Sequence, residues 1–478
     1  MSETHKIKEV PFLPSGSTLR GRLLKGTGAQ AFLQGVQIFI RLAEVPLLLA
    51  FWGTQLYGEW LMLSAIPAYL AIGDGGFAGA ACRDMTMKSG AGDRQGALAV
   101  FQSTWLLLLT VSIAVGLLAY GFVEVAPLAK WLGFSAMNDR DTGLVLLLLV
   151  AHVLIGFQGG LLDGGFWVSG RYPFGMSLQA VTQLLEFLGL GLAVILGGGP
   201  VQAAAGYVIG RVLGTGLMWI GQHRASSWLW YGFAHASLSE LRRLTAPAFA
   251  SLAFPLGNAL NIQGIRLVVG LALGPAAVAV FTPLRTLSRL AMQPRGIIDR
   301  LIQPELAIAF GASDLSLFRR LFTRSCQLAF WGCLIACLFV GASGYWVLPI
   351  WTSGKVVMHW PTFILLLSAA FVNGIWFIAL MVHYATNRHG WIAVFYTVIY
   401  GAIAFGLGYL GATFLGLAGA ALALLVVETT MSVIVVRSAL LMTGVDMSEW
   451  AWAVLHPPHE VIARAIIGLK KWMVATTL

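Results

Sequence analysis

Long apolar runs separated by short polar segments dominate this sequence. A membrane-spanning helix needs about 20 mainly apolar residues, and twelve runs reach that length. Glycine and proline interrupt many of them, which spanning helices tolerate because neighbouring helices and water satisfy the freed backbone groups. The pattern predicts twelve transmembrane helices, near residues 24–50, 59–82, 97–122, 143–166, 174–197, 200–222, 246–272, 276–297, 327–348, 361–383, 391–413 and 416–441.

The composition agrees with a chain made of spans and short loops. Of the 478 residues, 58% are hydrophobic and 10% are charged, whereas soluble domains carry about 25% charged residues. We therefore expect an all-α integral membrane protein. The first twenty residues contain no apolar run, so the first span is expected to direct insertion. The net charge of +10 is spread over loops without interleaved aromatics, so we expect no nucleic-acid partner.

The basic residues fix an orientation. With the N-terminus inside, 22 of the 30 lysines and arginines fall in inner segments, three in outer loops and five within spans. Basic loops face the cytoplasm, and one missed span would invert every later loop. The sequence therefore predicts that both termini are cytoplasmic.

A weak internal repeat divides the spans into two sets of six. With an offset of 221, Gly53 aligns with Gly274 and Asp93 with Asp314, on both sides of a span and without a gap. An even number of spans per half makes the repeats parallel, so we expect two six-helix bundles around a central cleft. After Pro458, an amphipathic stretch is expected to lie on the inner leaflet or to bind a partner. The predicted organisation is a cytoplasmic N-terminal segment 1–23, an N-terminal bundle 24–222, a cytoplasmic linker 223–245, a C-terminal bundle 246–441 and a cytoplasmic amphipathic tail 442–478.

Arginines within the predicted spans are the main candidate chemistry. A guanidinium at a helix centre costs about 2.5–3.5 kcal/mol on insertion scales and does not lose its charge. Such a residue must face protein, water or an anionic cargo. The sequence therefore predicts a polar, cationic cavity at membrane depth, supplied by Arg41, Arg211, Arg266, Arg285 and Arg289.

Three glutamates lie at similar depth. Glu186 and Arg211 sit mid-span on consecutive helices, which favours a structural ion pair. Glu44 follows Arg41 by three residues, so the two either neutralise each other or face a cavity. Glu44 and Glu428 are candidate ion-coupling residues, because a buried carboxylate can cycle a proton. For Glu428, a hydrogen bond to a neighbouring helix is an equal alternative. The candidate substrate-binding residues are Arg41, Arg266, Arg285 and Arg289.

No motif for catalysis or cofactor binding stands out. The sequence has no Walker A loop and no HExxH, and its four cysteines lack metal-ligand spacing. We expect no enzymatic activity, no cofactor and no metal site. Transport by this chain would then use an ion gradient, the membrane potential or downstream consumption of the cargo.

Several short motifs resemble those of bacterial polysaccharide flippases. Residues 53–61 contain the sequence YGEW, similar to the YGxW that begins the second span of that family, and residues 73–77 resemble the DxG that ends it. Gly92-Asp93-Arg94 before span three and residues 165–173 after span four are also similar. On these residues the chain resembles the polysaccharide-transporter branch, which includes O-antigen flippases, of the multidrug/oligosaccharidyl-lipid/polysaccharide exporter superfamily.

The resemblance implies a flippase of the bacterial cytoplasmic (inner) membrane. It would move undecaprenyl-diphosphate-linked oligosaccharide from the inner to the outer leaflet for surface polysaccharide or lipopolysaccharide synthesis, by alternating access through a cationic cleft. Its partners would be the lipid-linked oligosaccharide, membrane lipids and a glycan polymerase or other synthesis proteins. Arginine suits such a cargo, because its planar fork binds phosphate.

Two alternatives stay open. One is a cation-coupled multidrug exporter of the same superfamily, which needs an acidic site for cationic drugs. The other is a membrane glycan polymerase or ligase, which usually has a large polar outer loop. The longest outer loop predicted here is short, at about residues 123–142.

Overall fold

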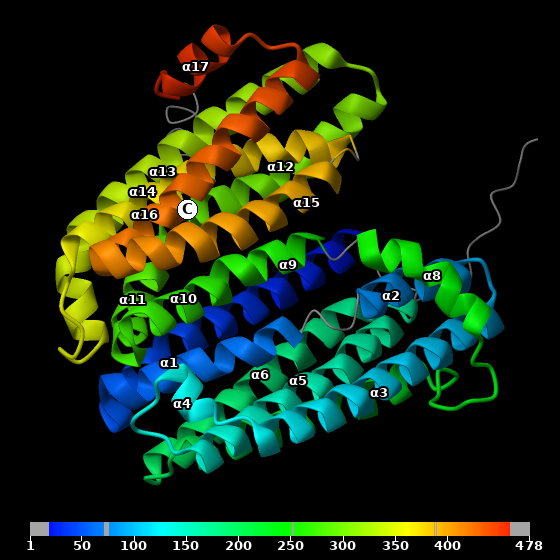
Figure 1. Ribbon diagram of the computed structural model, residues 1–478. Coiled ribbons are helices and arrows are strands. Elements are labelled where there is room, and N and C mark those ends of the chain that lie inside the picture. The colour runs from blue at the N-terminus through cyan, green and yellow to red at the C-terminus, as the bar shows by residue number, and fades with distance from the viewer. Residues whose placement is uncertain (1–18, 71–75, 251–252, 387, 389, 459–478) are drawn as a thin grey trace, which may run out of the picture. The chain divides into compact units, whose positions relative to one another are not determined.

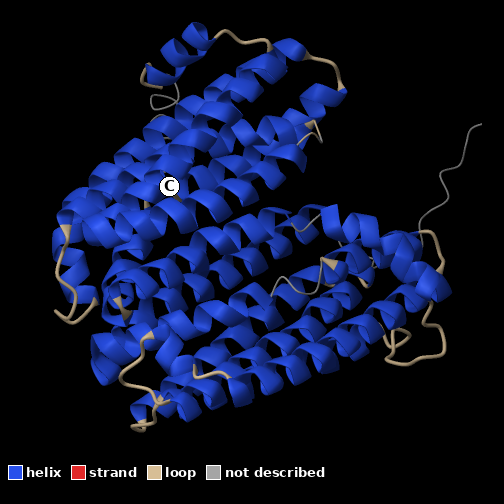
Figure 2. Cartoon of the chain, in the orientation of Figure 1, coloured by secondary structure: helices blue, strands red, loops and turns tan. Residues whose placement is uncertain are grey.

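The computed structural model describes residues 19–70, 76–250, 253–386, 388 and 390–458. These residues fold into helices joined by loops (Figure 2). The first 18 residues, most of the DxG segment, at 71–75, and the amphipathic stretch predicted after Pro458 lie outside the described residues. By its contacts the chain divides into two units. One extends to Ala279 and includes Trp351–Lys355, and the other comprises Val280–Ile350 and the chain from Val356 onward.

The first unit contains the first seven predicted spans. Within it, α7 packs along both α5 and α6, and α1 also packs on α6. A core of small and aromatic side chains lies between α2, α3 and α5. The helices of this unit, coloured from blue to green in Figure 1, are α1 (Leu19–Leu70), α2 (Phe77–Gly90), α3 (Arg94–Val125), α4 (Leu128–Leu132), α5 (Asp139–Val168), α6 (Tyr172–Ile195), α7 (Pro200–Ala225), α8 (Leu238–Ala250), α9 (Ala253–Ala259), the π-helix η1 (Leu260–Gly264) and α10 (Ile265–Leu273).

The second unit contains the remaining predicted spans. Its central contact is between α14 and α16, and α12 packs on α14. The first helix of the unit, α11, begins just before the division at Ala279. The helices are α11 (Pro275–Leu290), α12 (Gln293–Gly311), α13 (Leu315–Trp351), α14 (Trp360–Ala385), α15 (Gly390–Ile399), the π-helix η2 (Tyr400–Ala404), α16 (Phe405–Thr443) and α17 (Met447–Leu455).

The helices account for twelve crossings of a membrane. Nine helices in the described part of the chain are long and apolar enough to span one. Two of these, α1 and α16, are each divided by a non-helical glycine, Gly53 or Gly416, and so supply two crossings. The first arm of α16 completes span eleven, which begins in α15. The predicted eighth span corresponds to α11, which has 16 residues. The protein is thus a multi-pass, all-α membrane protein.

The structure corrects the predicted continuity of three spans. Span seven, expected as one helix over 246–272, is divided among α8, α9, η1 and α10. Span eight, expected over 276–297, ends at Leu290, and a separate helix, α12, follows it. Span eleven includes the π-helix η2. Hydropathy measures how apolar a stretch is, but it does not predict local breaks in helical hydrogen bonding.

The repeat found in the sequence is also present in the backbone. Gly53, which ends the first arm of α1, has φ 71° and ψ −175°, and the aligned Gly274 has φ 87° and ψ 166°. Only glycine adopts this conformation readily. Forty residues further on, Asp93 Oδ1 accepts from Gly96 N at 2.8 Å, and Asp314 Oδ1 accepts from Leu317 N at 2.9 Å. Residues 221 positions apart therefore have the same structural role in the two halves, once at a chain reversal and once at a helix N-cap.

The segment between α7 and α8 is hydrogen-bonded to α3. Gln102 Oε1 accepts from His235 N at 2.8 Å, and Ser103 Oγ accepts from Ser237 N at 2.7 Å. The domain boundary predicted at 223–245 stays a prediction. Contacts group α10 and η1 with the first unit, because both pack on α1.

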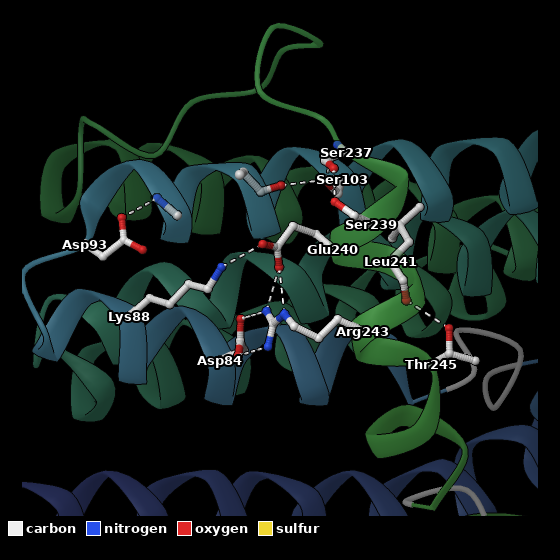
Figure 3. A network of polar contacts seen from close by, with 12 residues as sticks. Asp84, Lys88, Asp93, Ser103, Ser237, Ser239, Glu240, Leu241, Arg243 and Thr245 are labelled. Atoms are coloured by element: carbon white, nitrogen blue, oxygen red, sulfur yellow. Dashed lines mark hydrogen bonds and ion pairs between the residues drawn. The ribbon is translucent and has the colours of Figure 1, made fainter.

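An ion-pair network joins α8 to α2 (Figure 3). Arg243 Nη1 donates to Asp84 Oδ1 at 2.7 Å, and Nη2 donates to Asp84 Oδ2. The Nε of Arg243 also donates to Glu240 at 3.0 Å, and Lys88 Nζ donates to Glu240 at 2.9 Å. Burial acts to raise the pKa of Glu240, but the hydrogen bonds from Lys88 and Arg243 outweigh it and lower that pKa below its ordinary value of 4.5.

This network is expected to stabilise α8 in a pH-dependent way. A carboxyl whose pKa is lowered by folding contributes stability above its unfolded pKa and loses that contribution as the pH falls through the folded value. Thermal unfolding should therefore show the contribution of Glu240 in full at pH 7 and lose it progressively below about pH 4.5. The Glu240→Gln variant should lack this component. Equal acid sensitivity of the two proteins would contradict the assignment.

Candidate functional site

A cavity of about 480 Å³ opens within the first unit. Its walls come from α1, α2, α5, α6, α7 and η1, so it lies among the spanning helices. Trp60, Phe157 and Tyr207 are its aromatic lining residues. Ligand sites in proteins have this composition, apolar walls with a few convergent polar groups. The polar and charged residues on its walls are Glu44, Ser64, His152, Tyr207, Arg211 and Gln263.

Arg211 is held at the cavity wall by a buried glutamate and a histidine. Its Nε lies 2.9 Å from Glu186 Oε1 and donates a hydrogen bond to His152 Nε2 at 3.1 Å. The single hydrogen on Nε is donated to His152, so Arg211 and Glu186 attract each other as opposite charges. Among the described residues, no donor makes a hydrogen bond to Glu186 Oε1. The ring of His152 stacks on Tyr207 at 4.1 Å. The structure thus brings the predicted pair Glu186 and Arg211 together.

Glycine makes room for this guanidinium. A Cβ added at Gly156 of α5 would lie 3.7 Å from Arg211 Cζ, and Gly156 and Gly160 both line the cavity. Glycines in spanning helices favour close helix packing. The structure shows that they also border the cavity.

The second charged group on the wall is Glu44, which is half-buried on α1. Arg266 of α10 acts on it electrostatically and donates from Nη1 to Gln263 Oε1 at 3.0 Å. Arg41 lies on an exposed part of α1. Near this cavity, Glu44 and Glu186 offset Arg266 and Arg211 among the described residues. The cationic central cleft stays a prediction.

The YGEW motif of the second span has structural roles at the rim of this unit. Gly58 allows a close approach, because an added Cβ would lie 1.9 Å from the carbonyl oxygen of Pro275. The buried Glu59 accepts hydrogen bonds from the backbone nitrogens of Ser135, Ala136 and Met137, each at 2.8 Å. These contacts fix the loop after α4. Only the last motif residue, Trp60, reaches the cavity.

A second polar cluster is buried in the second unit around Glu428. This side chain, 6% exposed, accepts from Asn373 Nδ2 at 2.9 Å and from Trp376 Nε1 at 2.7 Å. The hydroxyl of Tyr400, the first residue of η2, also donates to it. Arg295 of α12 donates to Asn373 Oδ1 and lies 3.7 Å from the ring centre of Phe377.

The two remaining predicted arginines lie on α11 in the same unit. Arg285 is buried and Arg289 is half-buried. Arg285 acts electrostatically on Tyr400, and Arg289 acts on Arg295. Two described carboxylates, Glu428 and Asp299, also act on Arg295. That Arg41, Arg266, Arg285 and Arg289 bind substrate stays a prediction.

Sequence reasoning missed several members of these clusters. It did not single out Arg295, which the structure puts on α12 against α14. A signal was available in α14, where Asn373 and Trp376 stand three residues apart and so share one helix face. His152 and Tyr207 gave no signal that singles them out, because other polar residues, such as Gln158 and Arg211, lie in the same predicted spans.

Comparison with protein-family models gives no match, and comparison with curated proteins also gives none. Solved structures do match. An inward-facing multidrug resistance MATE family transporter of the MOP superfamily has a TM-score of 0.74 and 15% identity, over 85% of this chain and 94% of its own. The MATE multidrug transporter DinF-BH has a TM-score of 0.62 and 14% identity, over 89% and 96%. The chain has the MATE transporter fold.

A third solved structure with this fold differs in its site. It is a MOP superfamily transporter from Pyrococcus furiosus, with a TM-score of 0.59 and 15% identity, over 89% of this chain and 96% of its own. Its binding pocket is described as having reverse polarity, which suggests a different function for that protein. The MATE fold therefore includes pockets of more than one charge, and the residues of the site must be weighed for each chain.

Proposed function

We propose that the protein is a secondary transporter that exports amphipathic cations by alternating access, driven by a cation gradient. The observation that carries the proposal is the carboxylate of Glu44 on the wall of a partly aromatic cavity, where the nearby Arg211 is already held by Glu186. The solved structures described as multidrug transporters with the same fold support it. From the basic inner loops, we further propose a bacterial cytoplasmic membrane with both termini inside.

In this proposal, substrate and coupling ion compete for one carboxylate. A proton or Na⁺ bound to Glu44 neutralises the carboxylate that a cationic substrate needs. When that ion leaves, the carboxylate is negative again and binds the substrate. Trp60 and Tyr207 offer flat surfaces for an apolar body and attract a cation through their ring faces. Arg266, tied to Gln263, balances Glu44 when neither cation is bound.

We expect Glu44→Gln to lower gradient-driven transport about tenfold or more, which corresponds to about 1.4 kcal/mol of lost coupling. The measurement is efflux of a cationic rhodamine dye from proteoliposomes under an imposed Na⁺ or proton gradient. Glu44→Asp is the matched variant and should keep the ion dependence at a reduced rate. Unchanged gradient-driven efflux in Glu44→Gln would contradict the role of Glu44, and no dye movement under either gradient would contradict the drug-export function.

A specific observation favours a second candidate, flipping of undecaprenyl-diphosphate-linked oligosaccharide. Among the described residues of the second unit, Arg285 acts on Tyr400 and Arg289 acts on Arg295, and arginine suits a diphosphate. The Pyrococcus furiosus transporter, with its pocket of reverse polarity, offers a parallel within the same fold. In this case the lipid tail would stay in the bilayer while the second unit compensates the charge of the head group.

Under the second candidate, we expect Arg285→Ala together with Arg289→Ala to reduce lipid-linked oligosaccharide translocation about 100-fold, at about 1.4 kcal/mol for each lost phosphate contact. Translocation is measured in proteoliposomes as exposure of the glycan to an impermeant enzyme. Arg140→Ala, in an exposed position at the start of α5, is the control. A wild-type protein that moves the dye but not the lipid would exclude this candidate.

A further inference from the structure

A second pocket, of about 330 Å³, lies in the second unit between the start of α13 and the helix α17. Three of its lining residues are arginines, Arg319, Arg320 and Arg324, and one is the exposed Glu449. Thr323 and Gln327 add polar groups, and Trp452 and His456 form an aromatic side. The balance of fixed charge on the pocket wall is therefore positive.

The pocket is built by contacts that hold its walls in place. Arg319 Nε donates to the carbonyl oxygen of Thr443 at 2.6 Å, which ties α13 to the C-terminal end of α16. The carbonyl oxygen of His456 accepts from Gln327 Nε2 at 2.7 Å and from Trp331 Nε1 at 3.1 Å. These bonds fix the end of α17 along α13.

Two of the arginines are available to a ligand. Arg320 and Arg324 are exposed, and their spacing puts them on one face of α13, one turn apart. Asp314 acts on Arg320 from the N-cap of the same helix and offsets part of its charge. A guanidinium pair of this kind binds the oxygens of a phosphate group.

The location indicates a lipid rather than a soluble anion. Arg324 precedes the predicted start of span nine, residue 327, by about one helical turn. Trp452, 65% exposed, is of the residue type that concentrates at head-group depth. Leu455 of α17 and Leu441 near the end of α16 are also exposed, so apolar surface adjoins the basic pocket. Basic pockets at the cytoplasmic ends of spans bind anionic head groups.

We propose that this pocket binds the phosphate of an anionic phospholipid of the cytoplasmic leaflet. Arg320 and Arg324 bind the phosphate oxygens, Arg319 fixes the wall, and Trp452 lies at the level of the glycerol backbone. The negative charge of Glu449 repels the phosphate and so limits the affinity of the pocket for the lipid. The pocket shares no lining residue with the cavity of the first unit, and the proposal is independent of which cargo is moved.

The test uses the full chain in nanodiscs containing phosphatidylglycerol and phosphatidylcholine. Native mass spectrometry after release into detergent counts the lipids of each kind that stay bound. We expect enrichment of phosphatidylglycerol in the wild type, lowered about fivefold by Arg320→Gln or Arg324→Gln and about 25-fold by both, since each basic residue near an anionic surface contributes about 1 kcal/mol. Glu449→Gln should increase the enrichment.

The matched control is Arg224→Gln, at an exposed arginine near the end of α7 in the first unit. An equal loss in this control, or unchanged enrichment in the double variant, would overturn the proposal. Glycerol 3-phosphate in solution tests the other source of the same chemistry. We expect it to leave the retained lipid in place at equal concentration, and full displacement would assign the pocket to a soluble phosphate. All these side chains are exposed, so the variants are expected to fold.

Discussion

Glu186→Ala is expected to lower the free energy of unfolding by about 3 kcal/mol, at the lower end of the range for a broken buried ion pair. The variant leaves Arg211 without its carboxylate, next to a histidine that accepts only one hydrogen bond from it. Arginine does not release its proton, so the charge stays. The side chain of Arg211 is 25% exposed at the cavity wall, and water there limits the loss. Thermal unfolding in detergent measures it.

The reverse variant is expected to cost less. In Arg211→Met, Glu186 keeps His152, whose Nε2 lies 3.4 Å from Glu186 Oε2, and a carboxylate can also take up a proton. Replacing both residues, as Glu186→Leu with Arg211→Met, should bring stability back to within about 1 kcal/mol of the wild type, because apolar residues of similar volume often replace a buried pair without loss. A double variant as unstable as Glu186→Ala would show that the pair does more than neutralise charge.

The positions of the spans could be predicted because the membrane imposes one physical requirement on all of them. Each must present about 20 mainly apolar residues, and hydropathy measures that directly. The positions of two chain reversals could also be predicted, because Gly53 and Gly274 adopt a backbone conformation that mainly glycine allows. The π-helices could not be predicted, because a local change in backbone hydrogen bonding has no characteristic polarity: residues 260–264 include Asn261 and Gln263, whereas residues 400–404 are mainly apolar.

The sites were predicted less completely, because their residues meet only through tertiary packing. Glu186 and Arg211 were paired correctly since the short turn between α6 and α7 makes their helices antiparallel neighbours. Nothing local links Arg295 to Asn373, 78 residues away. Counting the charged residues within the predicted spans gave more arginines than glutamates, but a count does not show which acid lies beside which base. In the structure Glu186 lies beside Arg211, and Glu428 and Asp299 act on Arg295.

Glu428→Leu is expected to be as destabilising as any single change in the second unit, by about 3–5 kcal/mol. Three donors, on Asn373, Trp376 and Tyr400, would lose a buried acceptor together. Arg295 would also lose one of the two carboxylates that act on it. Glu428→Gln keeps an oxygen for these donors and should cost about 1–2 kcal/mol. Glu305→Leu, at an exposed glutamate of α12, is the control and should change stability by less than about 0.5 kcal/mol.

The same variants separate positioning from ion coupling. Because three donors already hold the carboxylate of Glu428, we expect its role to be the positioning of α14, η2 and α16, with Glu44 as the coupling residue. Glu428→Gln should then keep gradient-driven transport within about threefold of the wild type, about 0.7 kcal/mol, while Glu44→Gln loses it. Both are measured by the same proteoliposome efflux assay. If instead Glu428→Gln abolishes the ion dependence at near-normal stability, the coupling ion binds in the second unit, and Glu44 serves the substrate alone.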